Sequence, residues 1–364
     1  MQRPRELTDL TACRAIFALL VFLYHVNLHV GFAGALGWFA PVVTHGYLGV
    51  DGFFMLSGLI LARVERDMLF SVSGVLRFWG KRLARIYPVH LAVILLLTLL
   101  LAAGLAFGLT PRDPHRFGML ALLDNVLLIQ AWGALRHLAW NYPAWSISAE
   151  WAGYLVFPFI LAGLIEMSTM VIGTFIPLCF MLLGFLSFLH GGLNQTYLDS
   201  LPRFFVEFIA GMSMAFIVPL WADDMPGRAL AAIGAVGAVL SVMFLHDALT
   251  VFWLGLMLTG FAFEADAERP AVIGGLAPLH GLGVLSYAIY MSFAPAELLT
   301  SQALRHLGLA PATHGWLYAA MMSILTMILA LALHHLVELP ARRVLTARLD
   351  PARAEALADG SVPL

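Results

Sequence analysis

Ten apolar stretches, most of them about twenty residues long, constrain the fold of this chain more than any other feature. They lie at residues 13–33, 46–63, 87–109, 144–165, 169–189, 203–221, 228–245, 249–264, 280–304 and 316–338. A helix needs about 20 apolar residues to cross a bilayer, and only helices and closed barrels satisfy their backbone groups there. Because 61% of the residues are hydrophobic and only 12% are charged, we predict an all-α, polytopic membrane protein with ten transmembrane helices.

The basic residues lie in three groups, which predict how the chain is oriented. One group is at the N-terminus, a second lies within residues 63–85, and a third follows residue 341. Segments rich in Lys and Arg stay in the cytoplasm, so we expect cytoplasmic termini. One transmembrane domain then covers residues 1–345, and 346–364 form a short cytoplasmic tail. The N-terminal apolar run mimics a signal peptide, but no clean cleavage site follows it, and we interpret it as a retained span.

Two segments beside the predicted spans have a different character. Residues 117–133 are apolar but are interrupted by Asp124 and Asn125, so they are predicted to be re-entrant or laterally packed rather than to cross. Residues 73–87 alternate apolar and basic side chains at helical spacing, which indicates an amphipathic helix on the cytoplasmic surface. Pro88 is then expected to start the third span, because the first turn of a helix needs no backbone donor.

Arg14 and His25 lie eleven positions apart in the first apolar stretch. Eleven helical steps return a side chain to within about 20° of its starting direction and advance it about 16 Å. One helix face therefore carries a fixed cation near the membrane surface and an imidazole deep in the bilayer. Ionisable side chains inside a span are rare and point to function, and a neutral imidazole in such a place can act as a general base.

Two carboxylates are candidates to orient the imidazole of His25. Asp51 opens the second apolar stretch, and Glu150 opens the fourth. A carboxylate within a span costs about 2.5–3.5 kcal/mol and faces a partner or a cavity. The alternative is that each carboxylate only holds helices together through hydrogen bonds.

Arg82 and Arg85 lie three residues apart on the predicted surface helix, so their guanidinium groups point the same way. Together with Arg14 they would form a cluster of forked donors suited to phosphate groups. The alternative is that these arginines anchor the helix to lipid headgroups and set its topology.

Other residue patterns exclude several classes of site. His25 with His29, and His334 with Glu338, have the i, i+4 spacing of metal ligands, but neither pair has an obvious third ligand, so no metal is expected. Cys13 and Cys179 lie in or beside apolar spans and indicate no disulfide framework. The net charge of −2 gives no sign of a nucleic-acid partner.

Six separated motifs, taken in order, resemble the integral-membrane acyltransferase-3 family. They are Arg14 with His25, residues 46–58 (GYLGVDGFFMLSG), 82–88 (RLARIYP), 145–150 (WSISAE), 286–290 (SYAIY) and 338–343 (ELPARR). The resemblance covers residues 8 to about 345. Members of this family move acetyl or other short acyl groups onto bacterial surface carbohydrates.

The resemblance implies a function and a site. It implies an O-acyltransferase, most simply an O-acetyltransferase, of the bacterial inner membrane, which takes acyl-coenzyme A (acetyl-CoA) from the cytoplasm. Arg14, Arg82, Arg85 and Tyr87 would hold this donor. His25 would deprotonate a sugar hydroxyl, or form an acyl-histidine. Trp145 or Ser146 would stabilise the oxyanion. The acceptor would be an exopolysaccharide, a lipopolysaccharide or a lipid-linked precursor, with membrane lipids as the surroundings.

The chain also departs from the family, and other functions stay open. Family members often carry a histidine after the tyrosine pair of the penultimate span, where this chain has Ser292 and Phe293. The hydrolase-like domain that some relatives carry is not seen. One alternative function is a transporter or flippase of lipid-linked sugars with a proton relay. Another is a non-catalytic partner of a polysaccharide synthase.

Overall fold

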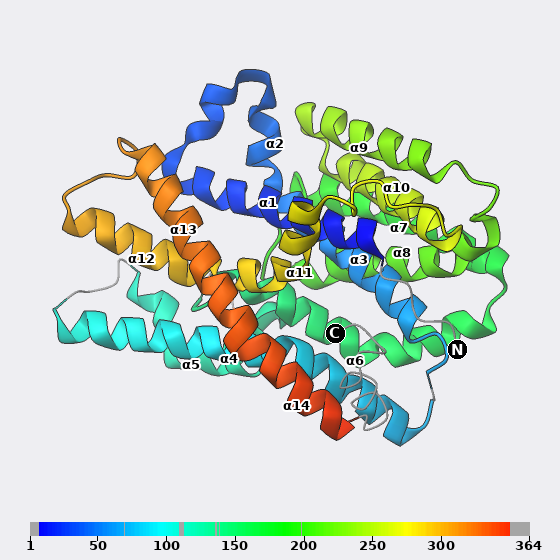
Figure 1. The fold of residues 1–364 in the computed structure, drawn as a ribbon, viewed down its shortest axis with the longest axis horizontal. Coiled ribbons are helices and arrows are strands. Elements are labelled where there is room, and N and C mark those ends of the chain that lie inside the picture. The colour runs from blue at the N-terminus through cyan, green and yellow to red at the C-terminus, as the bar shows by residue number, and fades with distance from the viewer. Residues whose placement is uncertain are drawn as a thin grey trace.

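The computed structural model describes residues 7–68, 70–108, 113–134, 137, 139–197 and 199–349, and within these ranges the regular secondary structure is entirely helical (Figure 1). The first half contains α1 (Thr8–Val30), η1 (Phe32–Phe39), α2 (Ala40–Thr44), η2 (Gly46–Leu48), α3 (Gly49–Val64), α4 (Val72–Ala106), η3 (Pro114–Phe117), α5 (Met119–Val126), η4 (Gln130–Ala134), η5 (Tyr142–Ala144) and α6 (Trp145–Glu166). The second half contains α7 (Thr169–His190), α8 (Ser200–Trp221), α9 (Gly227–Met243), α10 (Asp247–Asp266), α11 (Ala277–Met291), α12 (Phe293–His306), α13 (Gly315–Leu333), η6 (His334–Glu338) and α14 (Leu339–Leu349).

The helices confirm an all-α membrane protein and refine the predicted spans. In the part of the chain that the structure describes, eight helical segments are long and apolar enough to cross a membrane, or nine if the bent pair α11 and α12 counts as one span. The predicted span 228–245 forms α9, a shorter apolar helix of 17 residues. The predicted span 280–304 is not one straight helix but the pair α11 and α12, bent by 65°. Segment 117–133 contains a helix of only eight residues, α5, which is too short to span, as predicted. The orientation of the termini stays a prediction.

The expectation that Pro88 starts the third span is wrong. α4 runs without interruption over 35 residues, and Pro88 lies inside it. A proline within a helix removes one backbone donor, and neighbouring helices make this tolerable in membrane proteins. The amphipathic segment 73–87 and the third span are therefore one rigid element, so Arg82 and Arg85 are held at fixed positions relative to the membrane-spanning part.

Close helix pairs are built on small residues. A Cβ atom added to Gly58 of α3 would lie 2.1 Å from the Phe208 carbonyl oxygen, and one added to Gly211 of α8 would lie 2.0 Å from that of Met55. The same holds between α1 and α11, where a Cβ on Gly283 would lie 2.0 Å from the Thr11 carbonyl oxygen. Glycine permits such backbone approach in membrane helices, and it brings α3 against α8 and α11 against α1.

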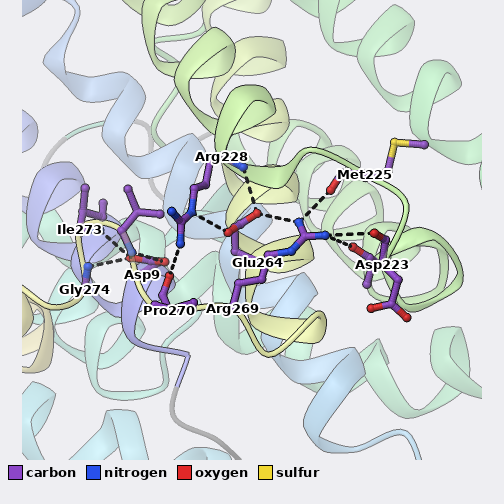
Figure 2. Close-up of polar contacts among 11 residues, drawn as sticks. Asp9, Asp223, Met225, Arg228, Glu264, Arg269, Pro270, Ile273 and Gly274 are labelled. Atoms are coloured by element: carbon purple, nitrogen blue, oxygen red, sulfur yellow. Dashed lines mark hydrogen bonds and ion pairs between the residues drawn. The ribbon is translucent and has the colours of Figure 1, made fainter.

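A polar network joins α1, α9 and α10 at the end of the bundle where α1 begins (Figure 2). The carboxylate of Glu264 accepts hydrogen bonds from Arg228 Nε (3.0 Å) and Arg269 Nη1 (2.9 Å). The carboxylate of Asp9 accepts from the backbone N–H groups of residues 272–274, at 2.7–3.0 Å. This network fixes the loop between α10 and α11 to the start of α1, the helix that carries Arg14 and His25.

The break between α11 and α12 follows from the sequence. Pro295 has no backbone N–H to donate to the carbonyl of Met291, and its ring clashes with a helix that continues through that point. α11 accordingly ends at Met291, and α12 begins at Phe293. The bend turns the start of α12 toward α1, so that the Phe293 ring lies 5.6 Å from that of His25.

Candidate active site

His25 lies in the second half of α1 and faces other helices rather than lipid. Its ring centroid is 5.4 Å from Tyr24, 5.2 Å from Tyr142 and 5.6 Å from Phe293. Tyr142 belongs to η5, directly before α6, and Phe293 opens α12. The imidazole is therefore flanked by residues from the start of α12 and from the short helix before α6.

A hydrogen-bonded chain fixes the orientation of His25. The hydroxyl of Tyr142 donates a short hydrogen bond to Glu297 Oε2, and its oxygen lies 3.3 Å from His25 Nδ1. A phenol carries one proton. Because that proton goes to Glu297, the Tyr142 oxygen accepts the Nδ1–H of His25. This tautomer leaves His25 Nε2 with a free lone pair, as a general base requires.

The carboxylate of Glu297 has two further partners, an imidazole and a guanidinium group. His29 Nε2 lies 3.3 Å from Glu297 Oε1, one turn of α1 beyond His25. The guanidinium carbon of Arg116 lies 4.7 Å from the centre of the Tyr142 ring, and this arginine interacts electrostatically with Glu297. A carboxylate at membrane depth is expensive unless it is paired, and here both of its oxygens are used. Glu297 is therefore held in place behind Tyr142.

The expectation that Asp51 orients His25 is wrong in geometry. Its two carboxylate oxygens accept from Arg203 Nε (2.8 Å) and Arg203 Nη2 (2.5 Å), while Glu207 Oε1 lies 3.6 Å from Arg203 Nε. All three side chains are at most 2% exposed. A buried carboxylate is stabilised best by a bidentate arginine, so Asp51 ties α3 to α8. This is the helix-joining role considered as the alternative.

Glu150 also makes contacts other than the expected one to His25. Its Oε1 accepts hydrogen bonds from Ser57 Oγ (2.7 Å) and from the Tyr154 hydroxyl (2.5 Å). It interacts electrostatically with Arg14. Glu150 thus belongs to the region around Arg14, about 16 Å along α1 from the imidazole by helical rise.

The three predicted arginines are connected through electrostatic interactions and shared partners. Arg14 interacts electrostatically with Arg85, as well as with Glu338. Within the described ranges, neither Arg14 nor Arg85 makes a hydrogen bond or ion pair to another side chain, so their N–H groups remain available to an anion. Arg82 donates to Glu65 Oε1 (2.9 Å) and lies over the Phe78 ring, and it shares with Arg85 an electrostatic interaction with Tyr154.

The remaining predicted site residues are held in structural contacts. Tyr87 donates to the Val126 carbonyl oxygen (2.9 Å), which fastens α5 to α4. Trp145 is 7% exposed and packs beneath the Arg203 guanidinium. The hydroxyl of Ser146 lies 3.0 Å from the Tyr290 hydroxyl. The described contacts bring neither Trp145 nor Ser146 to His25.

Sequence reasoning missed Tyr142 and Glu297 and considered His29 only as a metal ligand. One indication was present for Glu297, because it is the only acidic residue of the predicted span 280–304, and such residues point to function. Tyr142 precedes the 145–150 motif by three residues and gave no such sign. In the part of the chain that the structure describes, no three His, Cys, Asp or Glu side chains gather as a metal site requires.

Comparison with known proteins defines the class of this chain. A family profile described as an acyltransferase domain matches residues 7–335. A multi-pass helical chain with this match belongs to the acyltransferase-3 family.

Two curated relatives make the similarity more specific. Acyltransferase MdmB of Streptomyces mycarofaciens is 36% identical over 161 residues, which cover 43% of this chain and 39% of the relative. O-acetyltransferase OatA of Staphylococcus aureus is 25% identical over 332 residues, which cover 81% of this chain and 51% of the relative. The chain thus spans about half or less of the length of these relatives. No solved structure matches it.

Proposed function

We propose that this chain is a membrane O-acyltransferase that moves an acyl group, most simply acetyl, from acyl-coenzyme A to a carbohydrate hydroxyl. The observation that carries this proposal is the orientation of His25, whose Nδ1–H is bound by Tyr142 so that Nε2 is left as a base. Membership of an acyltransferase family and the similarity to an O-acetyltransferase support the reaction type.

The reaction follows from that tautomer. His25 Nε2 accepts the proton of the acceptor hydroxyl while the hydroxyl oxygen attacks the thioester carbonyl carbon. The carbon–sulfur bond then breaks, an ester forms, and the proton passes from the imidazolium to the thiolate of coenzyme A. Glu297, acting through Tyr142, stabilises the transient positive charge on the imidazole, as a buried carboxylate does for a catalytic histidine.

The phosphate groups of acyl-coenzyme A would be bound by the positive charges of Arg14 and Arg85. Arg14 and Arg85 repel each other, and a phosphate between them would relieve this repulsion and accept forked hydrogen bonds. Coenzyme A carries phosphates at one end and its thioester at the other, and its pantetheine arm would have to cover the rise of about 16 Å from Arg14 to His25. We infer that the arginines lie toward the cytoplasm and that the membrane is the bacterial inner membrane.

Binding and cleavage of acetyl-CoA by the purified protein test the proposed function. The full chain, purified in lipid nanodiscs, is given acetyl-CoA together with a glycan extract of the bacterial surface, and binding of the donor and release of free coenzyme A are measured. An O-acyltransferase binds acetyl-CoA, releases coenzyme A and acetylates the glycan, as mass spectrometry would detect. A transporter of lipid-linked sugars would do none of these, and that result would reject the proposal.

A further inference from the structure

A row of aromatic rings leads away from His25 to a second polar cluster. Tyr24 lies edge-on to His25 (centroids 5.4 Å) and to Tyr47 (5.4 Å), and Tyr47 lies 5.5 Å from His45. These rings come from the end of α1 and from the segment between α2 and α3, which lies next to the arm formed by η1 and α2 (Figure 1). None of them takes part in the hydrogen-bonded chain behind His25.

The row ends at a carboxylate with one oxygen lacking a hydrogen bond. Asp247 is 4% exposed, and its Oδ2 accepts from the Tyr47 hydroxyl (2.7 Å) and the Leu193 backbone N–H (2.7 Å). Its Oδ1 has no hydrogen-bond partner among the described residues, and His45 Nε2 lies 3.8 Å from it. A buried carboxylate oxygen without a hydrogen-bond donor is unfavourable. The hydroxyl group of a ligand could donate the missing hydrogen bond to Asp247 Oδ1.

A hollow in the surface is lined by residues close in sequence to those of the cluster. This hollow has a volume of about 340 Å³ and is lined by Gly37, Trp38, Pro41, Met243 and Phe244. Two lining residues lie close to the cluster along the chain. The carbonyl oxygen of Pro41 accepts the backbone N–H of His45 (2.9 Å), and Phe244 precedes Asp247 by three residues. Trp38 is 83% exposed, and Asn194, also exposed, donates to the Tyr24 hydroxyl (3.2 Å).

We propose that Tyr24, His45, Tyr47, Asn194 and Asp247 form the subsite that binds a neutral sugar of the acceptor and delivers its hydroxyl to His25. Sugars present hydroxyl groups that donate to carboxylates and accept from imidazole or amide groups, and their apolar ring faces stack on aromatic side chains. The negative charge of Asp247 disfavours phosphorylated or carboxylated sugars. This inference rests on the proposed function and specifies the class of its acceptor.

The test is sugar binding measured apart from catalysis. Saturation-transfer NMR is recorded on the full chain in nanodiscs with maltotriose and chitotriose as neutral probes and with tri-galacturonate as the anionic probe. At least one neutral probe is expected to bind the wild type more strongly than the anionic one does. Asp247→Asn is expected to weaken that binding about tenfold, the effect of one hydrogen bond to a charged group.

Two further variants keep the outcome clear. Asn194→Ala changes an exposed loop residue and is expected to weaken the same binding. Asp224→Asn, an exposed aspartate next to α8 and remote from the cluster, is the matched control and is expected to leave binding unchanged. Wild-type binding of no neutral probe, or equal binding by wild type, Asp247→Asn and Asn194→Ala, would overturn the subsite.

The two proposals fail in different ways. If the wild type binds acetyl-CoA and releases coenzyme A but binds no neutral sugar, the subsite is wrong and the proposed function stands. If it binds a neutral sugar through Asp247 but neither binds acetyl-CoA nor releases coenzyme A, the proposed function is wrong.

Discussion

At the scale of single residues, the site depends on a tyrosine placed between an imidazole and a carboxylate. The Tyr142 oxygen accepts a hydrogen bond from the Nδ1–H of His25, and the Tyr142 hydroxyl donates a hydrogen bond to Glu297. Catalytic histidines are often oriented by a carboxylate directly. Here the phenol of Tyr142 lies between the two groups, so Glu297 orients the imidazole indirectly, through the Tyr142 hydroxyl.

Tyr142→Phe tests this arrangement. The substitution keeps the aromatic ring but removes the oxygen that fixes the tautomer of His25. We expect the rate constant for coenzyme A release to fall at least about tenfold, because part of the general-base contribution is lost, while the KM for acetyl-CoA stays near that of the wild type. Steady-state thiol release measures both quantities. Tyr197→Phe, which removes a buried hydroxyl that contacts the Tyr142 backbone carbonyl rather than its phenol, is the control, and a wild-type rate for Tyr142→Phe would contradict the role of the phenol.

Arg203 is predicted to matter for stability rather than for chemistry. Arg203→Met would leave Asp51 and Glu207 buried side by side without their cation. Removing one partner of a buried ion pair costs about 3–5 kcal/mol, so the thermal unfolding midpoint in detergent should drop clearly. Arg343→Met, at an exposed position of α14, is the control and should unfold like the wild type. Equal midpoints for all three proteins would show that the buried triad contributes nothing to stability.

At the scale of elements, contacts between backbones position the site residues. α3 and α8 approach at Gly58 and Gly211, and this approach lets Asp51 reach Arg203. The bend between α11 and α12 brings Phe293 and Glu297 to the imidazole. The close approach of two helices and the bend between two others therefore determine which side chains meet in these regions.

Gly58→Leu is expected to separate α3 from α8. Its Cβ would lie 2.1 Å from the Phe208 carbonyl oxygen, and overpacking of this kind costs at least about 1–3 kcal/mol. The matched control is Gly163→Leu on α6, where a Cβ meets nothing within 4 Å. Fluorescence-detected size-exclusion chromatography after heating compares the two. If both variants survive heating equally, the close approach is not needed.

The sequence was sufficient for the helical class and for most elements, but not for their breaks. Apolar length alone locates the spans, because the bilayer imposes it. The bend at 280–304 was missed although Pro295 could have indicated it, since hydropathy does not register a missing backbone donor. The continuation of α4 through Pro88 was missed for the opposite reason. The proline was taken to start a helix, whereas contacts with neighbouring helices let a helix continue through it.

At the scale of the whole molecule, α1 connects two chemically different regions. Its first half carries Arg14, which interacts electrostatically with Arg85, and its second half carries His25 beside Tyr142. The common helix face of Arg14 and His25 could be predicted from spacing, since it depends on helix geometry alone. The partners of His25 could not, because Tyr142 and Glu297 come from distant segments that only tertiary packing brings together.

Arg85→Gln is expected to separate donor binding from chemistry. Loss of one forked donor to a phosphate should raise the KM for acetyl-CoA about tenfold or more and leave the maximal rate nearly unchanged. Arg82→Gln should have a smaller effect, because Arg82 is already bound to Glu65. Initial rates at varied acetyl-CoA concentrations provide the comparison. An unchanged KM in Arg85→Gln would show that the donor does not bind there.

The most direct test of the account is a comparison of wild type and His25→Ala, each as the full chain in nanodiscs. Acetyl-CoA binding and glycan-dependent release of coenzyme A in a single turnover are measured on the same samples. We expect His25→Ala to bind acetyl-CoA as tightly as the wild type and its rate of coenzyme A release to fall at least about 100-fold. Release at the wild-type rate by His25→Ala would contradict the central claim that this imidazole is the base.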